Sequence, residues 1–231
     1  VKSNTFLQHF YGIEVHTNKS VFNPKIATLM DFRVDQTKGI HFIYILPFTK
    51  NRALITSTMF SKEIKKKNWY LQQIKNYLSR NFQINSFVTL RNEFGVIPME
   101  PIKGSQYGLP GIGTNGNAVR ISSGYAFAFI QKQANLIVNK IKNNVNEQLN
   151  VPIPHKSIDL FLDRIFIDVL KTYPEKAPDI FICLVSNING DEMAEFMSGN
   201  ASIKTYLKII YAMPKIIFIV SFLKIFLKRE N

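Results

Sequence analysis

The first half of the chain carries the hydrophobic pattern of β-strands. Apolar residues alternate with polar or small residues over 5–17, which predicts a half-buried strand. Two apolar runs, 40–48 and 53–60, are separated by the short polar segment 49–52. This spacing predicts an antiparallel hairpin. A further strand is expected over 84–90.

After the hairpin the spacing of apolar residues becomes helical. Ser61 is suited to cap a helix over 62–80, whose inner face would be formed by Ile64, Leu71, Ile74 and Leu78. A second helix is predicted over 125–149, where apolar residues recur at positions 127, 130, 134, 137, 141 and 145.

Strands precede helices along the chain instead of alternating with them. This order favours an α+β fold with an antiparallel sheet and a helical C-terminal part. We expect a sheet domain over 1–100, a glycine-rich loop and helix over 101–150, and a helical region over 151–231.

The chain has 231 residues and a net charge of +13, concentrated in two segments. Residues 61–80 and residues 204–231 each hold six basic residues and one acidic residue, a net +5 apiece. Basic surfaces attract nucleic acid or anionic lipid. The lysines of the second segment are interleaved with long aliphatic residues and form no nucleic-acid motif, so we expect a membrane partner and no nucleic acid. The alternative is that each basic segment is simply a solvated face. For residues 61–80 this alternative and a binding surface are equally supported.

The segment after Pro214 is too short to span a bilayer but has the pattern of an interfacial helix. At helical spacing Ser221, Lys224 and Lys228 share one face, and the opposite face holds Phe218, Phe222 and Ile225. We therefore expect a cytoplasmic protein that is peripheral on the inner membrane. The alternative is a helix docked on the protein's own core with its lysines outward.

The chain offers no metal site and no disulfide framework. Cys183 is its one cysteine, which favours a reducing compartment. The four histidines lie at positions 9, 16, 41 and 155, without the spacing of zinc ligands.

A glycine-rich loop is the strongest local motif. Gly111, Gly113 and Gly116 match G-x-G-x-x-G, but no strand precedes them and no acidic residue follows at the spacing of a dinucleotide fingerprint. Ser123 and Gly124 lead towards the predicted helix, whose free N–H groups favour an anion. An ordinary surface loop is the alternative.

Several phrases of the sequence are similar to one family, the bacterial lycopene beta-cyclases. The matching stretches are Gln8–Val15, Leu29–Val34, Phe42–Phe48, Ala53–Ser61, Glu93–Met99, Gly111–Asn117 and Ser122–Phe127, with weaker likeness over Pro174–Pro178, Phe196–Ser198 and Ala212–Pro214. The resemblance extends over nearly the whole chain.

The resemblance implies a fold like that of flavin-dependent hydroxylases, with FAD and NAD(P)H as cofactors. It places the flavin near Gly111, Gly113, Thr114, Gly116, Ser123 and Gly124. The family's N-terminal G-x-G-x-x-G is absent, so we expect Val1 to begin the C-terminal part of a longer enzyme. We expect the 231-residue chain alone to be flavin-free and inactive.

The resemblance also implies a reaction, the non-redox cyclisation of the ends of lycopene to β-ionone rings. An acid protonates a terminal alkene, and a carboxyl group kept neutral by an apolar pocket suits this step. Family members carry an acidic residue in the strand where this chain has Thr56 and Ser57, which are therefore substrate-lining positions. The remaining matched acids are Asp31 and Glu93.

Each candidate has a simpler reading. Asp31 could pair with Arg33 or a backbone group, and Glu93 could be a turn residue before Gly95. The aromatic residues Phe42, Tyr44 and Phe48 are candidates to line a polyene tunnel and to stabilise a cation, and core packing is their alternative role.

Two other functions remain open. The first is a related flavoprotein, or an inactive cyclase-like homologue, that acts on another isoprenoid. The second is a basic, non-catalytic module that binds a membrane surface.

Overall fold

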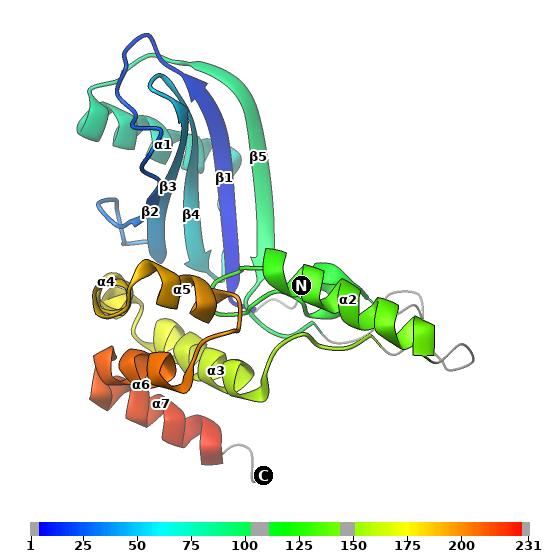
Figure 1. Cartoon of the computed structure of the whole chain (residues 1–231). Coiled ribbons are helices and arrows are strands. Elements are labelled where there is room, and N and C mark those ends of the chain that lie inside the picture. Colours follow the sequence, from blue (N-terminus) through cyan, green and yellow to red (C-terminus); the bar gives the residue numbers. More distant parts are fainter. Residues whose placement is uncertain (1–4, 103–110, 144–150, 228–231) are drawn as a thin grey trace. The chain divides into compact units, whose positions relative to one another are not determined.

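The computed structural model describes residues 5–102, 111–143 and 151–227. The chain divides into a sheet unit, residues 1–97, and a helical unit, residues 98–231. Strands are confined to the first part of the chain and most helices to the second, as Figure 1 shows. The α+β class is thereby confirmed. Val1 lies outside the described residues.

The sheet has five strands in the order β2-β3-β4-β1-β5. Their bounds are β1 Leu7–His16, β2 Thr28–Asp31, β3 Ile40–Thr49, β4 Arg52–Ser61 and β5 Val88–Pro98. β3 and β4 form the predicted antiparallel hairpin, and β1 pairs antiparallel with β4, with Gly12 opposite Thr56. β5, at the sheet edge beside β1, begins four residues later than the prediction from 84.

Helix α1, Lys67–Phe82, covers one face of the sheet (Figure 1). Its buried Ile74 and Leu78 pack into a core with Ile13 and Ile55 from the strands. Side chains of odd-numbered residues on β1, β3 and β4 enter this core because successive strand side chains point to opposite faces. The even-numbered side chains form the second face of the sheet, which α1 does not cover and which is called the open face below.

The predicted start of the first helix was wrong. Ser61 ends β4 opposite Leu7, and its hydroxyl donates to the carbonyl of Glu63. The helix begins at Lys67 after an extended Lys66. Ile64 consequently lies outside the helix, with 44% of its surface exposed.

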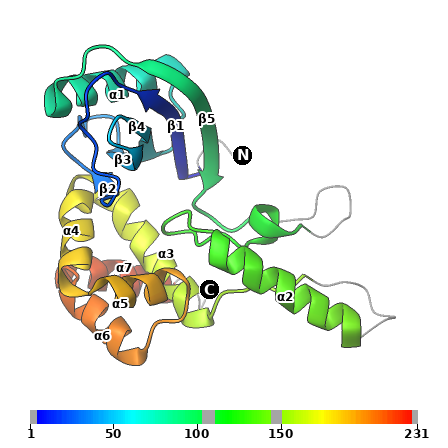
Figure 2. The ribbon, with the colours of Figure 1, turned by 45° about the horizontal axis from the view of Figure 1, so that its top comes forward.

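The helical unit holds the remaining helices (Figure 2). Their bounds are η1 Gly113–Gly116, α2 Phe127–Asn143, α3 Ser157–Thr172, η2 Pro174–Lys176, α4 Ala177–Asn187, α5 Gly190–Met197, α6 Ile203–Ala212 and α7 Lys215–Leu227. α4, α6 and α3 share a core of Val169, Ile180, Leu184 and Ile209. The end of the predicted 125–149 helix lies outside the described residues.

The apolar positions that predicted α2 do not form its buried face. Phe127, Ile130 and Ile141 are exposed, whereas Phe129 and Gln133 are buried. Gln133 is buried because it bonds the loop before the helix: its Oε1 accepts from the N–H of Gly113, and its Nε2 donates to the carbonyl of Gly116. The side of α2 that faces the loop is therefore the side of Gln133.

The faces predicted for α7 were wrong, because Phe218 and Phe222 lie on the same inner side as Ser221 instead of opposite to it. Ser221 is buried and Lys224 forms an ion pair with Asp168 of α3, so the polar stripe faces the protein. Phe218 and Phe222 pack against phenylalanines of α3. The outer residues of α7 are instead apolar, namely Ile216, Ile219, Val220, Leu223, Phe226 and Leu227. Lys228 lies outside the described residues.

Across the described residues, we find no single helix that is long and apolar enough to cross a membrane. α6 and α7 together meet the criterion of length and composition, but they are bent by 114° at their junction.

Candidate functional site

A carboxylate, a hydroxyl and a glycine meet on the open face of the sheet. Gly12 of β1 faces Thr56 of β4, and Glu93 comes from the edge strand β5. A Cβ atom built on Gly12 would lie 2.8 Å from Oγ1 of Thr56 and 2.9 Å from Oε1 of Glu93. Both polar atoms thus occupy the space that a larger residue at position 12 would fill. The structure brings together two of the predicted positions, Glu93 and Thr56.

Glu14 is a second carboxylate on this face, which the sequence analysis did not single out. It is 2% exposed and is bonded by the guanidinium groups of Arg52 and Arg91, the latter at 2.5 Å. The hydrogen bond from Arg52 lowers the pKa of Glu14, although burial opposes this effect. Glu14 is therefore ionised and has a structural role, so it is not suited to donate a proton. Its alternation with Gly12 on β1 was the signal that placed it on the open face.

The predicted aromatic residues do not form one continuous lining. The ring of Phe42 is fully buried and packs edge-on against Phe32, Tyr44 and Phe60. Tyr44 is half-buried, and burial raises its pKa to about 12, so its phenol stays protonated. Phe48 lies four residues after Tyr44 on β3, about 13 Å from it. There the guanidinium of Arg52 contacts the ring of Phe48.

Thr56 and Ser57 point to opposite faces of the sheet. Ser57 has no exposed surface and lies 2.9 Å from Nε2 of His41 on the face covered by α1. Burial lowers the pKa of His41 to about 4, so the imidazole is neutral at pH 7. The expectation that both residues line one substrate site is corrected: only Thr56 lies on the open face.

Asp31 is held as an ion-pair partner. Its carboxylate accepts hydrogen bonds from the guanidinium of Arg33 and, at 2.6 Å, from the hydroxyl of Tyr77. Burial alone would raise the pKa of Asp31, but these hydrogen bonds outweigh it and lower the pKa to about 2. The simpler reading of Asp31 is confirmed, and a carboxylate of this kind is poorly suited to donate a proton.

The glycines of the loop serve two different purposes. A Cβ on Gly111 would lie 2.4 Å from the carbonyl oxygen of Asn115, and a Cβ on Gly116 would lie 2.4 Å from that of Gly111. Glycine is required at both positions because the backbone of the loop passes too close to itself to leave room for a Cβ atom. Gly113 adopts φ +61°, and its Cβ position meets one atom, Cδ1 of Ile130 at 4.0 Å. Space for a ligand beside the backbone therefore lies at Gly113, next to the exposed Thr114.

The segment from Arg120 to Gly124 is a closed turn before α2. The N–H groups of Ser123 and Gly124 donate to the carbonyl of Arg120, and Gly124 adopts φ +71°. The predicted direct entry into a helix at Tyr125 was wrong, since α2 begins at Phe127. The free space beside the backbone favours Gly113 and Thr114 for contact with a flavin. The N–H groups of Gly113, Ser123 and Gly124 are already bonded within the protein.

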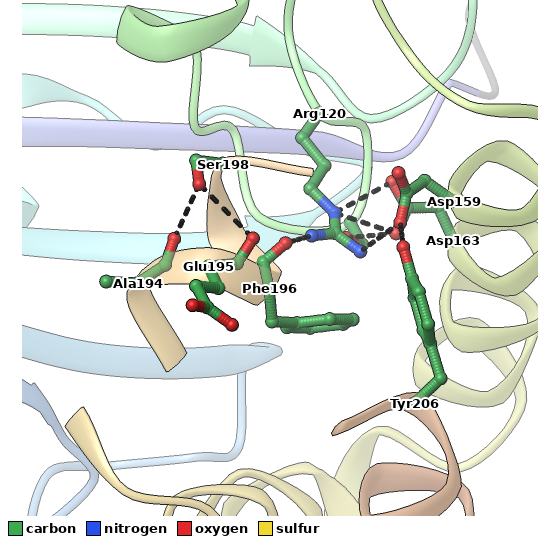
Figure 3. A network of polar contacts seen from close by, with 9 residues as sticks. Arg120, Asp159, Asp163, Ala194, Glu195, Phe196, Ser198 and Tyr206 are labelled. Carbon is green, nitrogen blue, oxygen red and sulfur yellow. Dashed lines mark hydrogen bonds and ion pairs between the residues drawn. The ribbon is translucent and has the colours of Figure 1, made fainter. Parts of the chain in front are cut away.

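A buried charged cluster that the sequence analysis missed joins this turn to α3 and α5 (Figure 3). The guanidinium of Arg120 donates to Asp163 at 3.1 Å, lies 3.8 Å from Asp159, and stacks 4.1 Å above the ring of Phe196. Ser122 donates to Asp163 at 2.8 Å, and Tyr206 donates to Asp159 at 2.6 Å. Burial raises the pKa of Asp163, and Arg120 opposes that shift only in part.

The sequence contained a signal for this cluster. Asp159 and Asp163 are four residues apart on α3, so both face one side of it. Within the described part of the chain, no group of histidine, cysteine, aspartate and glutamate residues is suited to hold a metal ion.

Comparison with known proteins adds independent information. The family model described as lycopene cyclase protein matches residues 1–221. A stretch of 54 residues is 41% identical to lycopene beta-cyclase of Paracoccus sp. (strain N81106 / MBIC 01143), which is 23% of this chain and 14% of that protein.

One solved structure is similar over 94% of this chain and 54% of its own, with 11% identity and a TM-score of 0.48. It is a geranylgeranyl bacteriochlorophyll reductase-like protein from Thermoplasma acidophilum. This likeness is too low to support an inference about function. The chain spans about half the length of that protein. The match of the family model over nearly the whole chain shows that the chain belongs to the lycopene cyclase family.

Proposed function

We propose that the protein is a lycopene beta-cyclase of carotenoid biosynthesis. Family membership supports the reaction class. The observation that carries the proposal further is the position of Glu93, whose carboxylate lies over Gly12 beside Thr56 on the open face of the sheet. Glu93 of β5 thus supplies a carboxyl group beside Thr56, so β4 needs no acidic residue of its own at this point.

In this proposal Glu93 donates the proton that starts cyclisation. The carboxyl proton adds to a terminal double bond of lycopene, and the resulting cation is attacked by a neighbouring double bond, closing the ring. Loss of a ring proton then restores the charge balance, so the reaction is an isomerisation. A polyene lying over Glu93 would exclude water and thereby favour the protonated carboxyl. Tyr44, neutral and half-buried, offers a ring face for the cation.

The cofactor proposal rests on the glycine loop. Gly113 and Thr114 would lie against FAD, because this is where the loop leaves space. When bound in its reduced form, the flavin supplies negative charge that stabilises a cation, and NAD(P)H is the proposed source of its electrons. Gly111 and Gly116 would shape the loop without touching the cofactor.

A membrane location is proposed because the substrate is a hydrocarbon. The exposed apolar residues of α7 continue onto α6, where Ile203, Leu207, Ile210 and Tyr211 are exposed. Basic residues of the same segment would favour anionic lipid. We therefore propose that the protein is cytoplasmic and lies on the inner membrane through α6 and α7.

Expression of the complete gene in lycopene-accumulating cells, followed by pigment analysis, tests the proposed function, because the 231-residue chain alone is expected to be inactive. We expect carotenes with one or two β-rings in place of lycopene. Unchanged lycopene in cells that contain folded protein would contradict the proposal.

One alternative is favoured by a specific observation, the lack of a carboxylate in β4 at Thr56. The protein would then be a cyclase-like homologue that acts on another isoprenoid or has lost activity. In the pigment assay, activity that appears only in Thr56→Glu would establish this alternative. The second alternative is a non-catalytic membrane-binding module. It predicts membrane binding, and no ring formation by the wild-type protein or by Thr56→Glu.

A further inference from the structure

An apolar cavity of about 450 Å³ lies inside the helical unit. It is enclosed by α3, α4, α5, α6 and α7, which gather in one bundle in Figure 2, and by the turn at Ser122 and Ser123. This volume is in the range of small-molecule sites, which is roughly 300–1,000 Å³. It far exceeds apolar cavities of about 150 Å³ that already accept benzene.

The chemistry of the wall restricts what the cavity can bind. Most lining side chains are aliphatic or aromatic, and the inner polar ones are already bonded within the protein. Asp163 accepts from Arg120 and Ser122, and Oγ of Ser123 accepts from the N–H of Tyr125. A ligand with a polar inner end would therefore lose its hydration without gaining a partner. A hydrocarbon end meets no such penalty.

The cavity is continuous with the exposed apolar surface of α6 and α7. Ile210, Ile219 and Phe222 line the cavity and are also 49%, 55% and 38% exposed, respectively. Lys215 lies at the same rim, with its ammonium bonded to the carbonyl of Tyr211. A chain that enters between these residues would come from the surface that we propose to contact lipid.

We propose that this cavity binds the open hydrocarbon end of an isoprenoid chain that enters from the bilayer between α6 and α7. The existence of a hydrocarbon site rests on the cavity alone. The choice of an isoprenoid over a phospholipid acyl chain rests on the proposed function. The site would take up a chain from the membrane and is distinct from the acid at Glu93.

Displacement of cis-parinaric acid, a fluorescent polyene fatty acid, tests the proposal with the protein in detergent solution. The competitors are squalene, a colourless linear isoprenoid hydrocarbon with open branched ends, and dioleoylphosphatidylcholine. Ile209→Trp fills the cavity from α6, where Ile209 is buried. Ile203→Trp is the matched control on the same helix, because Ile203 is 79% exposed and outside the lining. Phe218→Ala enlarges the cavity instead, and circular dichroism verifies the folding of each variant.

We expect the wild-type protein to bind parinarate and squalene to displace it at lower concentration than the phospholipid. Ile209→Trp should weaken parinarate binding at least about tenfold, equivalent to about 1.4 kcal/mol. Ile203→Trp and Phe218→Ala should retain binding. Equal binding by folded Ile209→Trp would overturn the site, and displacement by phospholipid but not by squalene would overturn the isoprenoid occupant. If squalene binds but the pigment assay shows no ring formation, the proposed function fails and the site stands.

Discussion

Oε1 of Glu93 lies 2.9 Å from the position that a Cβ of Gly12 would occupy, so the residue at position 12 controls the space available to this carboxylate. The two residues come from neighbouring strands, β1 and β5, that are distant in sequence. Thr56 approaches the same point from β4 at 2.8 Å.

Gly12→Ala should therefore reduce ring formation by about tenfold or more, because the new methyl group displaces Glu93 and Thr56. The crowding should cost about 1–3 kcal/mol of unfolding free energy. Pigment yield per amount of folded protein measures the first effect, and urea unfolding measures the second. Gly190→Ala is the matched control, since nothing lies within 4 Å of a Cβ at Gly190. Equal yields from both variants would contradict this role of Gly12.

Asp31→Asn should weaken the fold without abolishing ring formation. At pH 7 the loss of charge-assisted hydrogen bonds from Arg33 and Tyr77 should cost about 1–3 kcal/mol. The pKa of Asp31 is about 2 in the folded protein, below its ordinary value of 3.8. Its stabilising contribution is therefore present above pH 3.8 and is lost as the pH falls towards 2.

Urea unfolding of wild type and Asp31→Asn at pH 7 and pH 3 checks this prediction. The difference in unfolding free energy between the two proteins should be roughly half as large at pH 3 as at pH 7. Loss of all ring formation in folded Asp31→Asn would instead return Asp31 to the list of catalytic acids.

The sheet unit should lose stability in mild acid because two buried histidines resist protonation. Burial lowers the pKa of His9, which Lys65 lowers further, and also that of His41; both values fall from 6.5 to about 4. The unfolded chain therefore binds more protons between pH 6.5 and 4, so stability falls as the pH falls through this range. At pH 5 the loss is about 2 kcal/mol for each histidine.

Trp69 is the one tryptophan of the chain and contacts His41 from α1, so its fluorescence reports on this unit. Urea unfolding at pH 7 and pH 5 should show a smaller difference for His41→Gln than for the wild type. The same pH dependence in both proteins would show that His41 does not contribute.

Several elements could be predicted from the sequence because local alternation determines them. The hairpin of β3 and β4 and strand β1 follow a period of two that one buried face imposes. The same alternation already separated Thr56 from Ser57, although both were assigned to one site. The carboxylates Asp159 and Asp163 were likewise visible as a pair at helical spacing.

Other features depend on contacts between distant segments and could not be read locally. The polar stripe of α7 turns inward because Lys224 finds Asp168 on α3. The first helix starts late because β4 extends to Ser61 in pairing with β1. Glu93 reaches Gly12 because β5 takes the place beside β1, a neighbour relation that no local pattern encodes.

Membrane binding should depend on the outer face of α7. Leu223→Gln combined with Phe226→Gln removes two exposed apolar side chains, 49% and 46% exposed, and should weaken vesicle binding by about tenfold or more. Co-sedimentation with phosphatidylcholine vesicles that contain phosphatidylglycerol measures the effect. Ile182→Gln combined with Val185→Gln is the control, since both residues are 55% exposed on α4. Unchanged binding of the α7 variant would exclude this surface as the membrane contact.

The most direct test of the account concerns the acid itself. Glu93→Gln keeps the shape of the side chain but removes its proton, and Glu63→Gln makes the same change at another exposed glutamate, which pairs with Lys65. Ring formation from lycopene is measured for both variants at equal amounts of folded protein. We expect Glu93→Gln to lower the rate by about 100-fold or more and Glu63→Gln to match the wild type. A Glu93→Gln variant that forms rings at the wild-type rate would contradict this expectation.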